Sequence, residues 1–159
     1  LSTLAAGAAA IALLFLRLRR EAMLFTITVL LGWGLNAGMK LLVGRERPTL
    51  VPHLTEAAGY SFPSGHSFAS AMIYIGMALA FASLSSRHSV RYTLIGSAMV
   101  ISAIIAWSRV MLGVHFPSDV IAGWTGGAAW AFTAAALLYE PAKRAADSAA
   151  AHGLDPVHH

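Results

Sequence analysis

Three short polar clusters hold most of the side chains in this chain that could do chemistry, and each lies at the end of a long uncharged apolar run. The clusters are Lys40 with Arg47-Pro48, then Pro63-Ser64-Gly65-His66, then Ser108-Arg109 with His115 and Asp119. Together they supply cations, imidazoles, a carboxylate and a glycine-containing turn before a helix. Such groups are suited to holding a phosphate and attacking it.

The second cluster has the signature of a helix start. Serine and proline precede an apolar run, and Gly65 permits close backbone approach to a ligand. The first amides of a helix have no partner within it and point toward any anion bound there. Ser64 can add a hydroxyl donor, and His66 then stands beside the bound anion. The alternative is an ordinary helix cap with a polar histidine at the membrane interface.

The third cluster combines a base with an acid. Asp119 follows His115 by four residues at a helix start, so its carboxylate can accept a hydrogen bond from one ring nitrogen. The other nitrogen is then a base or a nucleophile. His53 and His66 could complete a metal site with this pair, but the neighbouring cations disfavour one.

The first cluster is a cationic span end. Lys40 and Arg47 are costly to hold near lipid unless an anion pairs with them. The planar fork of Arg suits phosphate oxygens, and Lys supplies a point charge. For Arg45 the simpler interpretation applies, in which the side chain extends to the lipid headgroups.

Composition predicts a membrane protein. Hydrophobic residues make up 57% of the chain and charged residues only 11%, against about a quarter in soluble domains. The basic residues lie between the apolar runs, not along one stripe interleaved with aromatics, so nucleic acid is not an expected partner. The chain has no cysteine, which excludes disulfides and thiolate metal sites. The apolar runs cover residues 1–16, 22–39, 67–86, 92–108 and 120–139.

These runs predict an all-α, polytopic transmembrane bundle with five visible spans. One domain occupies residues 1–141, and residues 142–159 form a polar, Ala-rich cytoplasmic tail without fixed structure. Basic residues concentrate in alternate connections, which places those connections in the cytoplasm and the three clusters on the outer face. Five spans leave the amino terminus outside, so we expect a further helix before residue 1.

Two groups of glycines predict close helix packing. Gly34 and Gly38 form one small-xxx-small pair, and Gly123, Gly126 and Gly127 form a second glycine-rich face. Small residues let helix backbones approach one another in membranes.

The pattern Lys-x6-Arg-Pro, Pro-Ser-Gly-His and Ser-Arg-x5-His-x3-Asp resembles the type 2 phosphatidic acid phosphatase (PAP2) family, the lipid phosphate phosphatases. The motifs match in order and spacing over residues 40–119. The resemblance implies a bundle that usually has six helices, with its site on the outer membrane face. It also implies an integral protein of the bacterial inner membrane that needs no cofactor and no metal.

The resemblance also implies a role for each matching position. His115 attacks phosphorus to form a phosphohistidine, and Asp119 orients it. His66 protonates the leaving alkoxide and then activates water. The non-bridging oxygens are held by Lys40, Arg47, Ser64, the Gly65 amide and Arg109, whereas Ser108 is structural.

The expected substrate is a lipid phosphomonoester or diphosphate, such as phosphatidic acid, phosphatidylglycerol phosphate or undecaprenyl diphosphate. The connection over residues 49–61 is a natural lid or headgroup selector. Three alternatives remain: a vanadium haloperoxidase, a phosphatase for a soluble phosphate ester, and a non-catalytic lipid-phosphate binding or transport protein. The membrane-length runs disfavour the first, because haloperoxidases are soluble.

Overall fold

The computed structural model describes residues 2–15, 19–49, 54–55, 58–82, 85 and 87–139, and this part of the chain is helical without a β-strand. The helices are α1 (Ser2–Phe15), α2 (Arg19–Val43), α3 (Gly65–Ala82), α4 (His88–Met111) and α5 (Pro117–Ala134), continued by a π-helical turn η1 (Ala135–Tyr139). The all-α bundle predicted from the apolar runs is confirmed. The predicted tail, residues 142–159, lies outside the described residues.

Four helices in the described part of the chain are long and apolar enough to cross a bilayer: Ala22–Val43, Gly65–Ala82, His88–Met111 and Pro117–Leu137. They correspond to four of the five predicted spans. The first predicted span forms α1, whose 14 residues extend about 21 Å at 1.5 Å per residue. That length is less than the roughly 30 Å of a hydrocarbon core.

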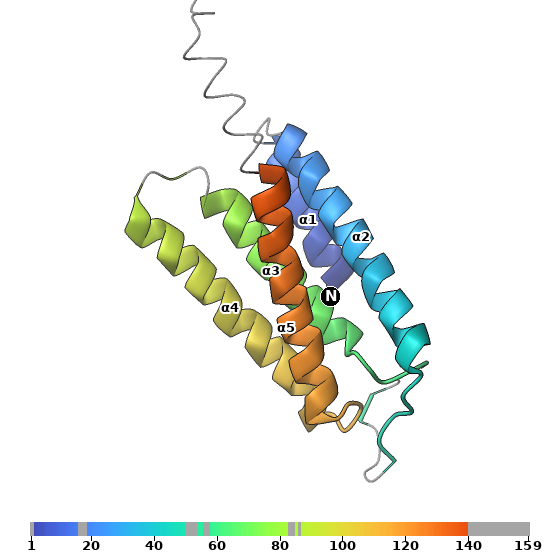
Figure 1. Cartoon of the computed structure of the whole chain (residues 1–159). Coiled ribbons are helices and arrows are strands. Elements are labelled where there is room, and N and C mark those ends of the chain that lie inside the picture. The colour runs from blue at the N-terminus through green and yellow to red at the C-terminus, as the bar shows by residue number, and fades with distance from the viewer. Residues whose placement is uncertain are drawn as a thin grey trace, which may run out of the picture.

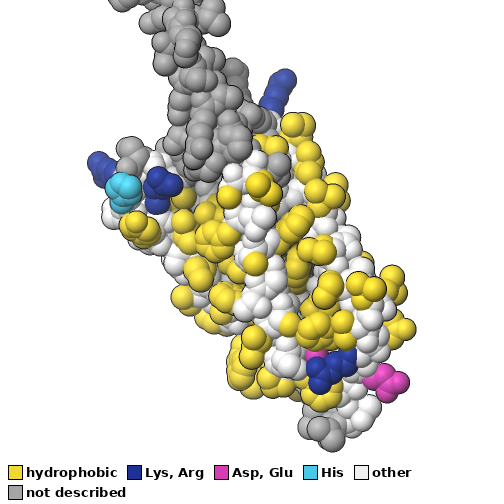
Figure 2. All heavy atoms as spheres, viewed as in Figure 1, with side chains coloured by type: hydrophobic (Ala, Val, Ile, Leu, Met, Phe, Trp, Pro, Cys, Tyr) yellow, Lys and Arg dark blue, Asp and Glu magenta, His cyan; other side chains and the backbone are white. Residues whose placement is uncertain are grey.

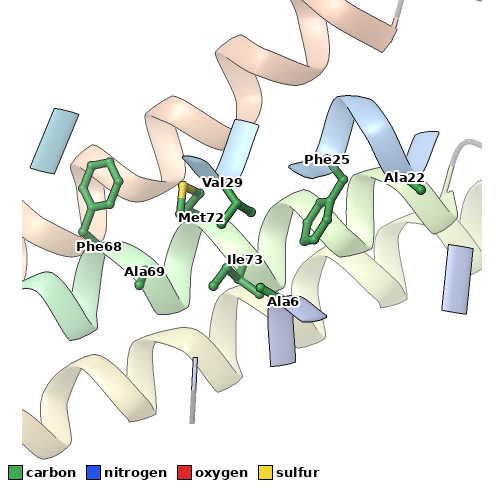
Figure 3. Close-up of a cluster of buried hydrophobic side chains, with 8 residues drawn as sticks. All are labelled: Ala6, Ala22, Phe25, Val29, Phe68, Ala69, Met72 and Ile73. Carbon is green, nitrogen blue, oxygen red and sulfur yellow. The ribbon is translucent and has the colours of Figure 1, made fainter. Parts of the chain in front are cut away.

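Helix α3 lies at the centre of the bundle (Figure 1). Within its span 67% of the residues are buried, against 17% in α4. One side of α3 packs with α1 and α2 in a cluster of eight buried side chains, drawn in Figure 3: Ala6, Ala22, Phe25, Val29, Phe68, Ala69, Met72 and Ile73. Its other side packs against α4 and α5 through a second cluster that includes Ile75, Ala98 and Ala131. Both faces of α3 are therefore fixed, and so is the position of its first turn.

Helix α5 approaches α3 through glycine, as predicted. A Cβ atom on Gly123 would lie 2.6 Å from the Ser64 carbonyl oxygen, and one on Gly127 would lie 2.3 Å from that of Phe68. No side chain fits at either position. The prediction for Gly34 and Gly38 is wrong, since a Cβ on either meets nothing within 4 Å among the described residues. Gly32 makes the close contact of α2 instead, against Met72 and Trp130.

Charged side chains gather at the two ends of the visible face, and hydrophobic side chains cover the band between them (Figure 2). Arg19, Arg87 and Arg91 belong to one end of the bundle, where α2 and α4 begin. The ends of α2 and α4 and the starts of α3 and α5 meet at the opposite end, the lower one in Figure 1. This alternation brings the three polar clusters to one end.

Candidate active site

The three polar clusters surround a cavity of about 280 Å³ at this end of the bundle. Its lining residues are Lys40, Arg47, Thr55, Ala58, Gly65, His66, Arg109, Val114 and His115. Three of them are cations and two are histidines, and no carboxylate is among the described residues of the wall. The buried Nε atom of Arg109 has no hydrogen-bond partner among the described residues. An unpaired buried donor is costly, so the cavity is suited to an anion.

Arg47 joins three segments around this cavity. Its Nε and Nη2 atoms donate to the carbonyls of Gly59 and Ala58, at 3.0 and 2.9 Å. Its Nη1 atom donates to the Val114 carbonyl at 3.0 Å and lies 3.2 Å from Nε2 of His115. Lys40 is fixed through a 2.8 Å hydrogen bond that its Nζ atom donates to the carbonyl of Tyr60. Both cations are thereby positioned before any ligand binds.

The hydrogen bonds around His115 define its tautomer. Guanidinium groups only donate, so Nε2 opposite Arg47 must accept, and the ring proton of a neutral imidazole resides on Nδ1. His115 is buried, and this burial, followed by the charge of Arg47, lowers its pKa to about 4 against the opposing attraction of Asp119. His115 is therefore neutral near pH 7 and presents an unprotonated Nε2 to the cationic wall.

His115 and Asp119 lie side by side, but their contact is longer than an ordinary hydrogen bond. Nδ1 of His115 lies 3.6 Å from Oδ2 of Asp119 and 3.3 Å from the hydroxyl oxygen of Ser61. That hydroxyl donates to Oδ2 of Asp119. The contact is long because Asp119 turns back to cap its own helix, accepting the Phe116 amide at 3.0 Å. Ser61 occupies the space between acid and base.

The prediction that Arg45 extends to the headgroups is also wrong. Its Nη1 atom donates to Oδ1 of Asp119 at 3.0 Å and to the Ser118 hydroxyl at 2.9 Å. Its guanidinium carbon lies 4.3 Å from the centroid of the Phe116 ring. Asp119 is fully buried, and a buried carboxylate needs such a partner. Arg45 thus fixes the acid that lies behind His115.

The second cluster contributes its glycine and histidine to the cavity, but not its serine. Gly65 and His66 line the wall, and His66 is exposed there. Ser64 is fully buried, and its hydroxyl oxygen accepts from the Ser67 hydroxyl at 2.9 Å and the Ser67 amide at 3.4 Å. The hydroxyl proton of Ser64 is not used in these bonds, so its contact with phosphate stays a prediction. An N-cap hydroxyl of this kind satisfies the first turn of α3.

The connection predicted as a lid contacts the site directly. Thr55 and Ala58 line the cavity, and the amide of Leu54 donates to the carbonyl of Leu112 at 3.2 Å. His53 and Glu56, which lie in the same connection, fall outside the described residues. Ser108 is structural, as predicted, because its hydroxyl donates to the Ile105 carbonyl within α4 at 2.6 Å.

Ser61 and Arg45 are site residues that the sequence motifs did not predict. Both lie next to a motif: Arg45 is two residues before Arg47, and Ser61 is three residues before Ser64. In the sequence, Ser61 looks like any serine in a turn between two motifs, so nothing indicates that its side chain is buried in the site. Only the fold shows its contact with His115 and Asp119.

A profile of the PAP2 superfamily matches residues 21–142, a range that contains all three polar clusters. The chain belongs to the PAP2 superfamily. Phosphatidylglycerophosphatase B of Bacillus subtilis (strain 168) is 37% identical over 97 residues, which cover 58% of this chain and 46% of the relative. Lipid A 1-phosphatase of Rhizobium etli is 36% identical over 128 residues, covering 74% of this chain and 50% of that protein. The chain therefore spans about half the length of these curated relatives.

A solved structure shows the same fold. The crystal structure of a transmembrane PAP2 type phosphatidylglycerolphosphate phosphatase from Bacillus subtilis matches with a TM-score of 0.59 and 30% identity. The match covers 86% of this chain and 74% of that one. Together with the four membrane-length helices, membership in the PAP2 superfamily makes this chain an integral membrane protein.

Proposed function

We propose that this PAP2 protein is a metal-independent phosphatase that hydrolyses a lipid phosphomonoester or diphosphate through a phosphohistidine. The observation that carries this proposal is the unprotonated Nε2 of His115 on a wall shared with Lys40, Arg47 and Arg109. A nucleophile and fixed positive charges around one small cavity suit attack on phosphorus.

In the first step, the phosphate of the substrate replaces Nε2 of His115 as the acceptor for Arg47, which frees the nitrogen lone pair. Nε2 attacks phosphorus, an N–P bond forms, and the P–O bond to the leaving group breaks. The departing alkoxide takes a proton from His66, which faces the cavity. The three cations and the Gly65 amide hold the non-bridging oxygens, where charge develops in the transition state.

In the second step, His66 accepts a proton from water while the oxygen of that water attacks phosphorus. The N–P bond breaks, inorganic phosphate leaves, and His115 returns to its neutral form. Fixed cations supply the charge stabilisation that a metal provides in other phosphatases. Ser64 shapes the first turn of α3 in this scheme, since its hydroxyl oxygen accepts from the Ser67 hydroxyl.

A lipid substrate suits the position of the cavity. The site lies where four helices of membrane length begin or end, so a headgroup can enter it while the tail stays in the bilayer. Phosphatidic acid, phosphatidylglycerol phosphate and undecaprenyl diphosphate remain the candidates, and two relatives are named for lipid phosphates. The connections predicted from the sequence to be cytoplasmic hold seven of the eleven Lys and Arg residues, which favours a site that faces the periplasm from a bacterial inner membrane.

A substrate panel tests this function. Purified protein in detergent is expected to release phosphate from at least one of the three lipids, with and without a chelator, and to leave a soluble sugar phosphate largely intact. Preference for the sugar phosphate would favour a soluble-ester phosphatase. Saturable lipid binding without turnover would favour a binding or transport protein. Loss of activity in chelator would contradict the metal-independent mechanism.

The pH dependence of kcat/KM is expected to be bell-shaped, because His115 must be neutral and His66 protonated. Since the pKa of His115 is lowered to about 4, its imidazole stays neutral, and so able to attack, until the pH falls to about 4. The acid limb should therefore lie near pH 4, below the range of an ordinary imidazole. Rates measured from about pH 3.5 to pH 9, corrected for substrate ionisation near pH 6 by ³¹P NMR, check this. An acid limb at the ordinary histidine pKa would contradict it.

A further inference from the structure

Ser61 connects His115 and Asp119, the base and the acid of the third cluster. Its side chain is fully buried, and its hydroxyl oxygen is 3.3 Å from Nδ1 of His115. The same hydroxyl donates to Oδ2 of Asp119. Asp119 itself stays 3.6 Å from Nδ1, beyond the usual range for an N–H···O bond.

Donor and acceptor capacity fixes the direction of these bonds. A serine hydroxyl has one proton to donate and two lone pairs that accept. The carboxylate of Asp119 accepts only, so the hydroxyl proton points to Oδ2 and a lone pair faces Nδ1. The chain of donors therefore runs from Nδ1–H of His115 through the Ser61 hydroxyl to Asp119.

The surroundings hold this hydroxyl in place from both sides. The amide of Ser61 donates to the Arg45 carbonyl at 2.7 Å, which fixes its backbone. The carboxylate that it meets is held by the Arg45 guanidinium at Oδ1 and by the Phe116 amide at Oδ2. Arg45 thus anchors both the hydroxyl and its acceptor. Ser61 and Asp119 are both fully buried, so water has no access to bridge Nδ1 of His115 and Asp119 in place of the hydroxyl.

We propose that Ser61 is a positioning residue that relays the charge of Asp119 to His115 and holds the imidazole ring in place through Nδ1–H. The inference rests on the proposed function, in which Nε2 is the nucleophile. Orientation by a hydroxyl bonded to a carboxylate differs from direct orientation by the carboxylate. In this protein, the acid acts on the nucleophile through Ser61.

Replacing Ser61 by alanine tests the relay. We expect kcat to fall roughly 10- to 100-fold, because the ring loses its nearest acceptor, while KM stays within about threefold, because the cationic wall is unchanged. Ser70→Ala is the matched control. Ser70 is a buried serine too, but it lies within α3, where its hydroxyl donates to the carbonyls of Ser67 and Ser102 and does not line the cavity. That variant should keep its activity. A kcat for Ser61→Ala within twofold of the unmodified protein would overturn the relay.

A second pair separates the hydroxyl from side-chain volume. Ser61→Thr and Ser61→Val have nearly the same shape, and only threonine retains the hydroxyl. The kcat of Ser61→Thr is expected to be about ten times that of Ser61→Val, even if crowding lowers the activity of both variants. Equal activity of the two variants would contradict a role for the hydroxyl.

Nitrogen NMR provides a readout that does not depend on turnover. In ¹⁵N-histidine-labelled protein, the His115 signals, identified by their absence in His115→Ala, should show Nδ1 protonated and Nε2 unprotonated near neutral pH. Ser61→Ala should keep this tautomer, because Arg47 still faces Nε2, but its Nδ1–H proton signal should shift upfield as the hydrogen bond to the Ser61 hydroxyl is lost. An unchanged Nδ1–H shift would contradict the proposal. If the unmodified protein cleaves no phosphate ester, the proposed function fails, and the Nδ1–H shift of Ser61→Ala still decides the relay.

Discussion

His115→Ala is expected to reduce phosphate release from the preferred lipid phosphate by about 10⁴-fold or more. The variant retains the three cations of the wall, so substrate still binds, but no nitrogen remains to form the N–P bond. The loss should therefore appear in kcat, with KM changed little. Initial rates of phosphate release in detergent, at substrate concentrations on both sides of KM, measure this split.

The matched control is His88→Ala. His88 is exposed on the first turn of α4, at the opposite end of the bundle, and stacks on Tyr92 with ring centroids 6.3 Å apart. Its removal should leave the rate unchanged. Brief incubation with ³²P-labelled substrate should also leave acid-labile, alkali-stable label on the unmodified protein and none on His115→Ala. Robust turnover by His115→Ala would sink the phosphohistidine mechanism.

Gly123→Ala has the second-largest expected effect, although it adds one methyl group to a helix that touches no substrate. The new Cβ would lie 2.6 Å from the Ser64 carbonyl oxygen and 3.2 Å from the Ser64 amide nitrogen, so the start of α3 must move. Ser64 also donates its amide to the carbonyl of Asp119 at 3.0 Å, and this bond must stretch or break. We expect about 1–3 kcal/mol of destabilisation from crowding.

The same displacement should lower kcat about 100-fold, because Gly65 and His66 follow Ser64 directly and an error near 1 Å at a catalytic group has such an effect. Gly126→Ala on the same helix is the control. Its Cβ would meet the Phe68 ring at 3.5 Å, an ordinary van der Waals contact, and alanine favours a helix over glycine. Thermal unfolding and kcat should both stay near those of the unmodified protein. Equal behaviour of the two variants would contradict the close contact.

Much of the fold follows from the order of apolar runs. Each run is long enough for a helix, and each polar cluster stands at a run end, so the alternating direction of consecutive spans places the clusters at one end. Gly123 and Gly127 were predictable as contact residues, because small residues at this spacing let membrane helices pack. Gly34 and Gly38 are also closely spaced, but an added Cβ on either meets no described residue within 4 Å, since the pattern does not say which face of a helix meets a neighbour.

The site, like the fold, was predictable from the sequence only in part. The cations and histidines of the cavity wall were predictable by type and position, because lipid penalises a charge that has no function or partner. The contacts among them were not. The spacing of His115 and Asp119 suggested a direct hydrogen bond, but the spacing on a helix start equally allows the carboxylate to cap its own helix, and it does.

The sequence by itself determined that this is a helical membrane protein with a phosphate site at one end of the bundle, since helix length, charge and motif order are local properties. The tertiary structure decided how the nucleophile is oriented. Ser61 and His115 are 54 positions apart, and Arg45 and Asp119 are 74 apart. Their contacts depend on where α3 and α5 cross, and close packing at Gly123 and Gly127 fixes that crossing.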